Sequence, residues 1–370
     1  MKKAANLGPA ASSIGLWALR ITAVLLFAGT LASHTRFEQW WIRIWDFPRL
    51  QILIALVVVT IIIAAVDRKT RPYLPLALLA CAAWQAYRVY PHSFLAPVEV
   101  VAAASDQPAE ACLSVMSFNV LQFNRDYAKT RKMIEEVNAD VVLLLETDQR
   151  WQSALEPVLR GYPHRLDQPI GNTYGIMFAS KLPMSQSSIQ NLAEPGTPSV
   201  FTTLQVGGRE VRVFGIHPRP PHPGQDTDER DFELVKVGQL AARENRAVLV
   251  MGDFNDVAWS NTSELFKKTG RLLDPRIGRG SFATFPSNMI WLAWPLDHLF
   301  VSEHFVLKDI RVLSDVGSDH RGIVSKICLD PKRGELLNDD AGALDRTDRK
   351  ETREIIGDFR EDKRDDVTAD

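Results

Sequence analysis

Apolar positions are distributed differently in two parts of the chain. The N-terminal part is almost continuously apolar, whereas later apolar runs are short and alternate with polar segments. Residues 50–66 are nearly all aliphatic, and about 17 residues is close to the shortest helix that spans a bilayer. Because a soluble helix would carry a polar face, we predict a membrane span here. Residues 13–32, interrupted by Arg20, and residues 74–90 are predicted as two further spans.

Basic residues predict how these spans are oriented. Lys2 and Lys3 precede the first span, and residues 67–71, between the second and third, include three more basic side chains. Basic segments stay on the cytoplasmic side, so three crossings place the remainder of the chain outside the cytoplasm. If residues 13–32 are instead a cleaved signal peptide, the basic segment still predicts the same final side.

Composition divides the chain into four parts. Residues 1–95 form the predicted membrane segment, and residues 96–111, rich in alanine and small polar residues, are predicted to be a flexible linker. Residues 112–330 have the composition of a mixed α/β globular domain. Residues 331–370 are highly charged and poor in apolar side chains, so we expect a disordered tail.

In the globular part, apolar strands repeatedly carry a polar residue at an end. The predicted strands cover residues 113–120, 140–146, 174–181, 211–217, 247–255, 296–301 and 317–324, with an amphipathic helix over 129–137. The polar residues at their ends are Asn119, Glu146, His217, Asp253, Asn255, Asp297, Asp319 and His320. Any one of them alone is more simply a turn or capping residue, but the set as a whole suits phosphate and divalent-metal chemistry.

Two of these positions are informative by themselves. Asp253 and Asn255 are two residues apart at the end of a strand, so they are expected to project to the same side. Glu146 follows five apolar residues, and a carboxylate there is costly unless it is exposed, paired or bound to metal.

In combination and order, the polar motifs resemble those of the endonuclease/exonuclease/phosphatase superfamily, which includes the DNase I-like nucleases. The motifs are Ser117-Phe118-Asn119, Leu145-Glu146-Thr147, Tyr174-Gly175-Ile176 with Ser180-Lys181, Gly252-Asp253-Phe254-Asn255, Leu296-Asp297-His298 and Ser318-Asp319-His320. The resemblance covers about residues 112–329 and implies an α/β fold, a four-layer α/β/β/α sandwich with the site at one edge of two packed sheets. It is closest to membrane-attached bacterial members, which implies the inner membrane with the domain on the periplasmic side.

The resemblance also implies what the site residues do. It implies a Mg²⁺ site, with Mn²⁺ as the alternative, formed by Glu146, Asn119 and Asp319. It implies that His320 and Asp297 orient and activate the attack on phosphorus and that Asp253 acts as acid or base. Asn255 and His217 are implied to donate hydrogen bonds to phosphoryl oxygens. Leu121 replaces an acid found in some nucleases, which leaves the number of metal ions open.

Four more residues are candidates for contacts with substrate. Arg219 and His222 either meet a second phosphate or anionic head group, or face solvent from a rigid proline-rich loop. Trp291 and Trp294 precede Asp297 and either form an apolar wall that touches lipid or pack inward.

The resemblance further suggests a disulfide. In this fold the first and last strands of the domain are antiparallel neighbours, so Cys112 and Cys328 are expected to face each other at the end remote from the site. An oxidising compartment permits a bond between them, and the alternative is two small buried thiols.

These observations favour a membrane-anchored, Mg²⁺-dependent phosphoesterase that acts on phosphodiester or phosphomonoester bonds. The substrate is open between a lipid or head-group phosphoester and nucleic acid. A net charge of −2 and the lack of a dense lysine and arginine cluster near the motifs weigh against nucleic acid. An extracytoplasmic endo- or exonuclease is the first alternative, and a non-catalytic binding domain on the same fold is the second. No specific protein partner is predicted.

Overall fold

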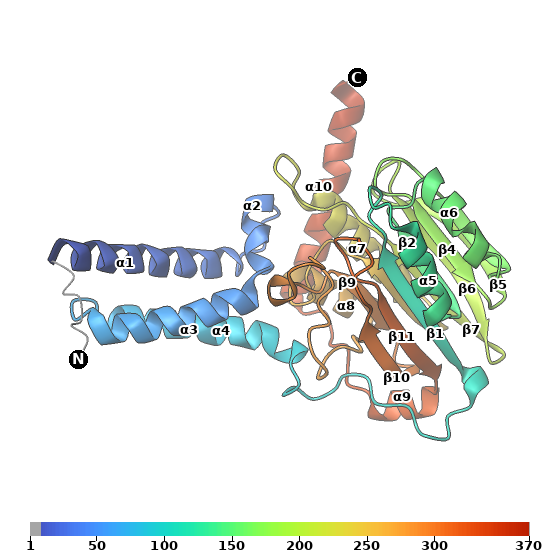
Figure 1. Ribbon diagram of the computed structural model, residues 1–370, viewed down its shortest axis with the longest axis horizontal. Helices are drawn as coiled ribbons and strands as arrows, with labels where there is room; N and C mark the ends of the chain where they lie inside the picture. Colours follow the sequence, from blue (N-terminus) through green and yellow to red (C-terminus); the bar gives the residue numbers. More distant parts are fainter. Residues whose placement is uncertain (1–8, 370) are drawn as a thin grey trace. The chain divides into compact units, whose positions relative to one another are not determined.

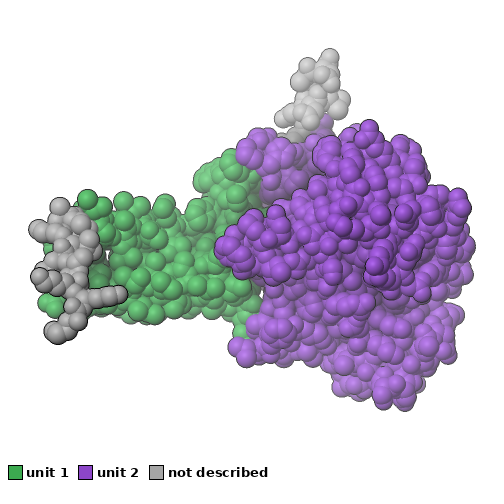
Figure 2. All heavy atoms as spheres, viewed as in Figure 1, with its two compact units in different colours: residues 1–91 green, residues 92–370 purple. Residues whose placement is uncertain are grey.

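The computed structural model describes residues 9–369. The chain divides into two compact units, residues 1–91 and residues 92–370 (Figure 2). Within the described residues, the first unit is helical (Figure 1). Its elements are α1 (Pro9–Ala32), α2 (Trp40–Arg43), η1 (Ile44–Asp46), α3 (Arg49–Val66) and α4 (Tyr73–Val89), followed by η2 (Tyr90–His92) at the boundary.

Two helices of the first unit could cross a membrane, judged by length and composition alone. They cover Ser13–Ala32 and Arg49–Val66 among the described residues. The third predicted span forms helix α4, which has 17 residues. The helices therefore agree with the first two predicted spans in position, while the third crossing remains a prediction.

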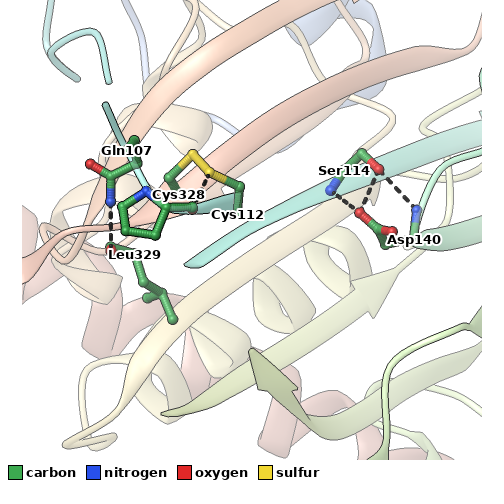
Figure 3. Close-up of a disulfide and its surroundings, with 7 residues drawn as sticks. Gln107, Cys112, Ser114, Asp140, Cys328 and Leu329 are labelled. Carbon is green, nitrogen blue, oxygen red and sulfur yellow. Dashed lines mark hydrogen bonds between the residues drawn. A yellow bond between two sulfur atoms is a disulfide. The ribbon is translucent and has the colours of Figure 1, made fainter. Parts of the chain in front are cut away.

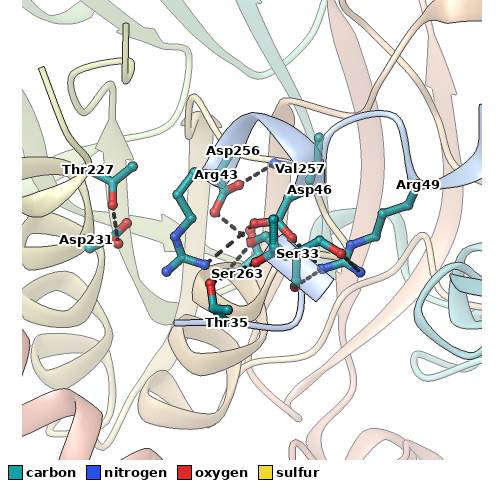
Figure 4. A network of polar contacts seen from close by, with 12 residues as sticks. Ser33, Thr35, Arg43, Asp46, Arg49, Thr227, Asp231, Asp256, Val257 and Ser263 are labelled. Carbon is teal, nitrogen blue, oxygen red and sulfur yellow. Dashed lines mark hydrogen bonds and ion pairs between the residues drawn. The ribbon is translucent and has the colours of Figure 1, made fainter. Parts of the chain in front are cut away.

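The first unit buries several polar side chains beside an apolar core and exposes many apolar side chains. Arg49 is fully buried, forms an ion pair with Asp46, and donates to Ser33 Oγ and Gln85 Oε1, each at 3.2 Å (Figure 4). Gln85 in turn donates to Thr30 Oγ1 at 3.2 Å. The exposed apolar side chains include Ile14, Trp17, Val24, Ile54, Val58, Ile61, Leu76 and Leu79. A water-soluble helical bundle usually exposes mainly polar side chains, so this apolar surface is unusual for one.

The second unit is built on two sheets. The first has six strands in the order β10 (Phe305–Val312), β11 (Ile323–Leu329), β1 (Cys112–Asn119), β2 (Val141–Leu145), β4 (Ile176–Ser180) and β3 (His164–Gln168). The second has five strands in the order β5 (Met184–Asn191), β6 (Pro198–Val206), β7 (Arg209–Ile216), β8 (Ala247–Asp253) and β9 (Asp297–Val301). The remaining elements are η3 (Ala109–Ala111), α5 (Tyr127–Val137), α6 (Gln149–Leu159), α7 (Asp228–Ala241), α8 (Asn261–Gly270), η4 (Ile290–Leu292), α9 (Pro331–Leu337) and α10 (Arg346–Ala369).

Three apolar clusters hold the layers together. Alternate residues of β1 point to opposite faces, so Val115 enters the core between the sheets while Phe118 packs under α5 and α6. In β8, Leu249 and Val250 divide in the same way between the central core and the layer formed by α7 and α8. Strands covered on both faces need apolar side chains on both, which explains their unbroken apolar runs. The predicted four-layer α/β/β/α sandwich is confirmed.

Residues 96–111 do not form the flexible linker that their composition predicts. Val100 is fully buried in the core between the sheets, and Ala103 N donates to Leu307 O at 2.7 Å. The Glu99 carboxylate is buried and accepts from Lys267 Nζ and from Asp274 N, each at 2.6 Å. These partners are far along the chain, so the local composition does not show them.

The expectation of a disordered tail after residue 330 is also wrong. The described part of this segment forms α9 and α10, and α10 packs on α7. Ile355 and Phe359 are four residues apart, so they lie on one face of α10, and both are buried. The Phe359 ring stacks on Phe232 with centroids 3.8 Å apart. A few apolar residues at helical spacing are therefore enough to dock a highly charged segment.

The predicted disulfide between Cys112 and Cys328 is present (Figure 3). These residues face each other where β1 pairs with β11 in the antiparallel direction. Next to the bond, Gln107 Nε2 donates to Leu329 O at 3.3 Å (Figure 3). The bond therefore closes a loop that carries the strands of both sheets, with a sequence separation of 216 between its two cysteines.

Gly252 allows the backbones of β7 and β8 to approach closely. Its φ is 149°, and a Cβ atom there would lie 1.9 Å from the carbonyl oxygen of Ile216. We expect Gly252→Ala to push the strands apart and to lower the free energy of unfolding by about 3 kcal/mol. Denaturant unfolding of the full chain in detergent measures this difference. Gly171→Ala is the control variant, because a Cβ atom there meets nothing within 4 Å. Equal stability of the two variants would contradict this explanation.

Glu233 of α7 makes folding stability depend on pH. Its carboxyl is fully enclosed, and burial raises its pKa from 4.5 to about 7 although Ser199 donates a hydrogen bond to it. Since the pKa is higher in the folded state, stability is full below about pH 4.5 and falls by about 3 kcal/mol as pH rises to 7. Glu233→Gln is expected to flatten this part of the profile, measured by denaturation at pH values across this range. An unchanged slope would mean that other groups cause it.

Candidate active site

The polar residues predicted at strand ends converge at one edge of the two sheets. Asn119 ends β1, Glu146 follows β2, and Asp253 ends β8. Because β1 and β2 are parallel, their carboxyl ends lie at the same edge. Asn119 Nδ2 donates to Glu146 Oε1 at 2.9 Å and to Asp253 Oδ2 at 3.1 Å. This one amide therefore joins the two sheets at the site.

Asp297 and His320 reach the same edge from the start of their strands, not from the end as the sequence suggested. Asp297 is the first residue of β9, which is antiparallel to β8 and places Asp297 opposite Asp253. His320 precedes β11, which is antiparallel to β1. An antiparallel strand begins where its neighbour ends, so both residues join Asn119 and Asp253.

Asp253, Asp297 and His320 form a buried cluster. His320 Nδ1 lies 2.8 Å from Asp297 Oδ2, and His320 Nε2 lies 3.4 Å from Asp253 Oδ2. His217, directly after β7, places Nε2 3.8 Å from the same Asp253 oxygen. Asp297 thus fixes the His320 ring and leaves Nε2 directed toward Asp253.

Burial and neighbouring charges shift the pKa values in this cluster. Burial by itself would lower the pKa of His320, but Asp253 and Asp297 outweigh it and raise that pKa to about 10. Burial lowers the pKa of His217 to about 4. Burial also raises the pKa of Asp253 and that of Glu146. At neutral pH, His320 is therefore a cation next to a neutral His217.

Asn255 is not placed by strand alternation as expected, because β8 ends at Asp253. Asn255 adopts a left-handed conformation with φ of 50°, and its backbone N–H donates to Asp253 Oδ1 at 2.9 Å. Its side-chain Nδ2 donates to Pro218 O at 2.9 Å. One amide N–H is used in this bond, and the second remains for another acceptor.

Two buried polar atoms in the cluster have no hydrogen-bond partner within the described part of the chain. They are His217 Nδ1 and Asp297 Oδ1. Buried polar atoms in folded proteins are nearly always paired, and exceptions gather at functional sites. Both atoms are consistent with a site that is completed by a ligand.

A family model described as the Endonuclease/Exonuclease/phosphatase family matches residues 116–320, more than half of the chain. The chain belongs to this family. The match begins inside β1 and ends at His320, so it includes every catalytic and metal-binding residue predicted from the sequence. Members of the family are generally hydrolases of phosphoester bonds.

Solved structures of the family share the fold at low sequence identity. Humanized TDP2 of D. rerio, carrying 14 mutations, is 16% identical with a TM-score of 0.50, covering 59% of this chain and 99% of its own. A family protein from Beutenbergia cavernae is 19% identical with a TM-score of 0.48, covering 60% and 72%. A mannosyl-6-phosphatase from Bacteroides thetaiotaomicron is 18% identical with a TM-score of 0.48, covering 59% and 100%. No curated protein matches the sequence.

The four residues suggested for substrate contact lie at different places. Arg219 is half-buried, forms an ion pair with Glu194, and lies over the Tyr174 ring. His222 is exposed, and its Nδ1 lies 3.2 Å from Pro223 O. Trp291 is exposed, with 79% of its surface accessible. Trp294 is half-buried and lies close to Phe285, with ring centroids 6.4 Å apart.

The oxygen donors beside Asn119 fit a divalent cation. Burial and then the charge of Asp319 raise the pKa of Glu146, so two carboxyl groups lie near each other. Among the described residues, neither forms an ion pair with lysine or arginine. Together with the Asn119 amide oxygen they make an all-oxygen donor set, which hard cations prefer. The cluster of Asp253, Asp297 and His320 is also compact enough for a metal ion.

Three residues that support the site were not singled out from the sequence. Gln122 N donates to Glu146 Oε2 at 3.1 Å, and Asp297 N donates to Thr284 Oγ1 at 3.3 Å. The buried Arg230 of α7 donates from Nη1 to the carbonyl oxygen of Asn255 at 3.0 Å. Each of these hydrogen bonds joins a side chain to a backbone group. Because every residue has a backbone, the residue types in the sequence do not predict such bonds.

Proposed function

We propose that this chain is a membrane-anchored, Mg²⁺-dependent phosphoesterase that hydrolyses phosphodiester or phosphomonoester bonds of lipids or their head groups. One observation carries the proposal: the buried cluster of Asp253, His320 and Asp297 is joined through Asn119 to Glu146. This arrangement combines a fixed cation, proton-accepting carboxylates and an oxygen donor set at one edge of a family fold of phosphoester hydrolases.

The contacts of each residue suggest its part in the reaction. Asp297 holds His320 so that the imidazolium Nε2 donates to a phosphoryl oxygen and stabilises the charge that develops on it. Asp253, whose pKa burial raises, takes a proton from the attacking water or gives one to the leaving group. His217 and the second amide N–H of Asn255 donate to the remaining phosphoryl oxygens.

Mg²⁺ is the proposed cofactor, with Mn²⁺ as the alternative. Glu146, Asp319 and the amide oxygen of Asn119 would hold it. A divalent ion supplies positive charge against the phosphoryl oxygens, which suits in-line displacement at phosphorus. The Gln122 backbone N–H and the Asn119 amide orient the Glu146 carboxylate for this purpose.

Anchoring in the membrane is supported by the first unit. Its helices expose large apolar side chains such as Ile61 and Leu79 and enclose Arg49 and Gln85. Charged residues within membrane bundles typically face the interior and pair there, as Arg49 does with Asp46. We further propose three crossings of the bacterial inner membrane, with the catalytic unit in the periplasm.

Reporter fusions test this orientation. Alkaline phosphatase, which is active only outside the cytoplasm, is fused after residue 105 and, as a matched control, after residue 69. High activity at residue 105 and low activity at residue 69 are expected, because the basic segment 67–71 stays inside. The opposite pattern would overturn the periplasmic placement.

Exposed apolar residues beside the site support a lipid as the source of the phosphoester. Phe123 directly follows Gln122, which contacts Glu146, and 66% of its surface is accessible. Trp291 is on the loop that Ser287 ties to Asp319, with Ser287 N donating to Asp319 O at 2.7 Å. Aromatic side chains at such positions suit the interface between water and lipid.

A substrate panel tests the proposed function. Purified full-length protein in detergent is offered phospholipids in vesicles, their soluble head-group esters, single- and double-stranded DNA, and simple phosphomonoesters, with Mg²⁺ or with EDTA. We expect hydrolysis of a lipid or head-group ester that EDTA abolishes. Cleavage of DNA alone would replace the lipid assignment by that of a nuclease, and no hydrolysis of any substrate would favour a binding role.

A further inference from the structure

The C-terminal helix reaches the border of the active site. Near the end of α10, Lys363 Nζ donates to Glu194 Oε1 at 3.1 Å. Glu194 lies between β5 and β6 and also forms an ion pair with Arg219. We call Arg219, Glu194 and Lys363 the rim cluster. It brings together residues from three separate parts of the chain.

Packing fixes α10 in this position. The Phe359 ring lies nearly parallel to Phe232 of α7, with an interplanar angle of 13° and centroids 3.8 Å apart. One turn earlier, Ile355 is buried in a cluster with Val235 of α7 and Leu265 of α8. Lys363 is one turn beyond Phe359, so the docked helix delivers its ammonium group to Glu194.

The rim cluster is linked to the catalytic residues by direct contacts. Arg219 follows His217 by two residues, and its guanidinium lies 5.9 Å from the centre of the Tyr174 ring. The Tyr174 ring in turn lies beside the His217 ring, with centroids 5.5 Å apart. Pro218, between His217 and Arg219, accepts the hydrogen bond from Asn255. The Tyr174 ring and Pro218 thus connect Arg219 to His217 and Asn255.

Within the rim cluster, two cations share the single carboxylate of Glu194. Burial opposes ionisation of Glu194, but Lys363 and Arg219 outweigh it and lower its pKa, so one carboxylate is shared by two cations. Two acids lie next to the rim cluster, Asp228 and Glu229, and burial and the charge of Asp228 raise the pKa of Glu229 to about 7. A carboxylate shared in this way leaves donors of Arg219 and Lys363 for a further anion.

We propose that Arg219 and Lys363 form an anion subsite next to the catalytic cluster, which selects phosphoesters that carry a second anionic group. The proposal rests on the proposed function for its substrate class. The second group is a phosphate or a carboxylate, since a guanidinium fork binds either in bidentate fashion. Glu194 occupies the subsite in the absence of ligand and competes with the incoming anion. The tail helix is thereby part of substrate recognition.

Binding of non-hydrolysable ligands tests the subsite independently of catalysis. Alkane bisphosphonates of increasing length are compared by calorimetry with alkyl phosphonates of the same length, using full-length protein in detergent with Mg²⁺. We expect one bisphosphonate length to bind about tenfold more tightly than its monophosphonate. Equal affinity at every length would overturn the proposal even if the protein hydrolyses phosphoesters.

Substitutions in the rim cluster are expected to change the preference for the bisphosphonate in opposite directions. Arg219→Ala and Lys363→Ala are expected to reduce the preference for the bisphosphonate about fivefold each, whereas Glu194→Gln removes the competing charge and is expected to increase it. Lys350→Ala is the control, since Lys350 is also on α10 and its exposed side chain pairs with Glu354 of the same helix, at 3.1 Å. A loss of preference in Glu194→Gln would overturn the proposed competition by Glu194, and an equal loss in Lys350→Ala would show that α10 acts through folding alone.

Hydrolysis identifies where the second anion comes from. Glycerophosphoserine and glycerophosphoethanolamine differ by one carboxylate and are compared as free esters and as diacyl lipids in phosphatidylcholine vesicles. A higher kcat/KM for the serine ester in either form, lost in Lys363→Ala, supports the subsite and identifies the form recognised. Absence of hydrolysis together with the bisphosphonate preference would place the failure in the proposed function and not in the subsite.

Discussion

Glu146→Gln is expected to lower kcat for Mg²⁺-supported phosphoester hydrolysis by about a thousandfold. The substitution keeps the shape of the side chain and an oxygen for the Gln122 N–H, but it removes the negative charge that would hold the cation. His320→Gln is expected to have an effect of similar size for another reason. It removes the cation that Asp297 fixes beside Asp253, while the metal donors stay in place.

Metal titration separates these two effects. Glu146→Gln should need a much higher Mg²⁺ concentration for half-maximal activity, whereas His320→Gln should keep the metal requirement of the unaltered protein. Glu136→Gln is the control, because Glu136 is an exposed residue of α5 whose partner is Lys132 on the same helix. If both site variants kept full activity, the assignment of the reaction to this edge of the sheets would have to be abandoned.

The resemblance to the family implied the sandwich, whereas short-range patterns in the sequence predicted the strands and the polar residues at their ends. Apolar runs such as Val141–Leu145 indicate strands covered on both faces, and polar residues at their ends must meet where the strands share an edge. Strand direction was not available from the pattern alone. Asp297 and His320 were therefore expected at strand ends, although the antiparallel course of β9 and β11 brings them to the site from strand starts.

The errors about the linker and the tail concern contacts between residues that are distant in sequence. Glu99 is ordered by Lys267, which is 168 residues away, and nothing in the alanine-rich segment around Glu99 indicates this partner. Phe359 is ordered by Phe232 on another helix. Composition indicates whether a segment can form a core of its own. It does not predict the order of a segment that packs against the core of another part of the chain. Arg219 was a candidate from the sequence, but its partners Glu194 and Lys363 were not, for the same reason.

Loss of the disulfide between Cys112 and Cys328 is expected to destabilise the second unit by about 4 kcal/mol. The two cysteines have a sequence separation of 216, so the bond closes a long loop. The conformational entropy that a disulfide removes from the unfolded chain grows with loop length. Denaturant unfolding of the full chain in detergent, comparing the Cys112→Ser/Cys328→Ser double variant with the unaltered protein, measures the difference. A reductant should destabilise the unaltered protein to about the same level and leave the double variant unchanged. Equal stability of both proteins without reductant would contradict the prediction.

The disulfide also bears on catalysis through the strands it joins. β1 runs from Cys112 to Asn119, and β11, paired with it in the antiparallel direction, begins just after His320 and carries Cys328 near its far end. Fixing the remote ends of this pair fixes the register that sets Asn119 against His320. We therefore expect the double variant to lose activity at denaturant concentrations at which its overall fold, followed by circular dichroism, persists. If activity and fold are instead lost together, the bond stabilises the unit as a whole and has no separate effect on the site.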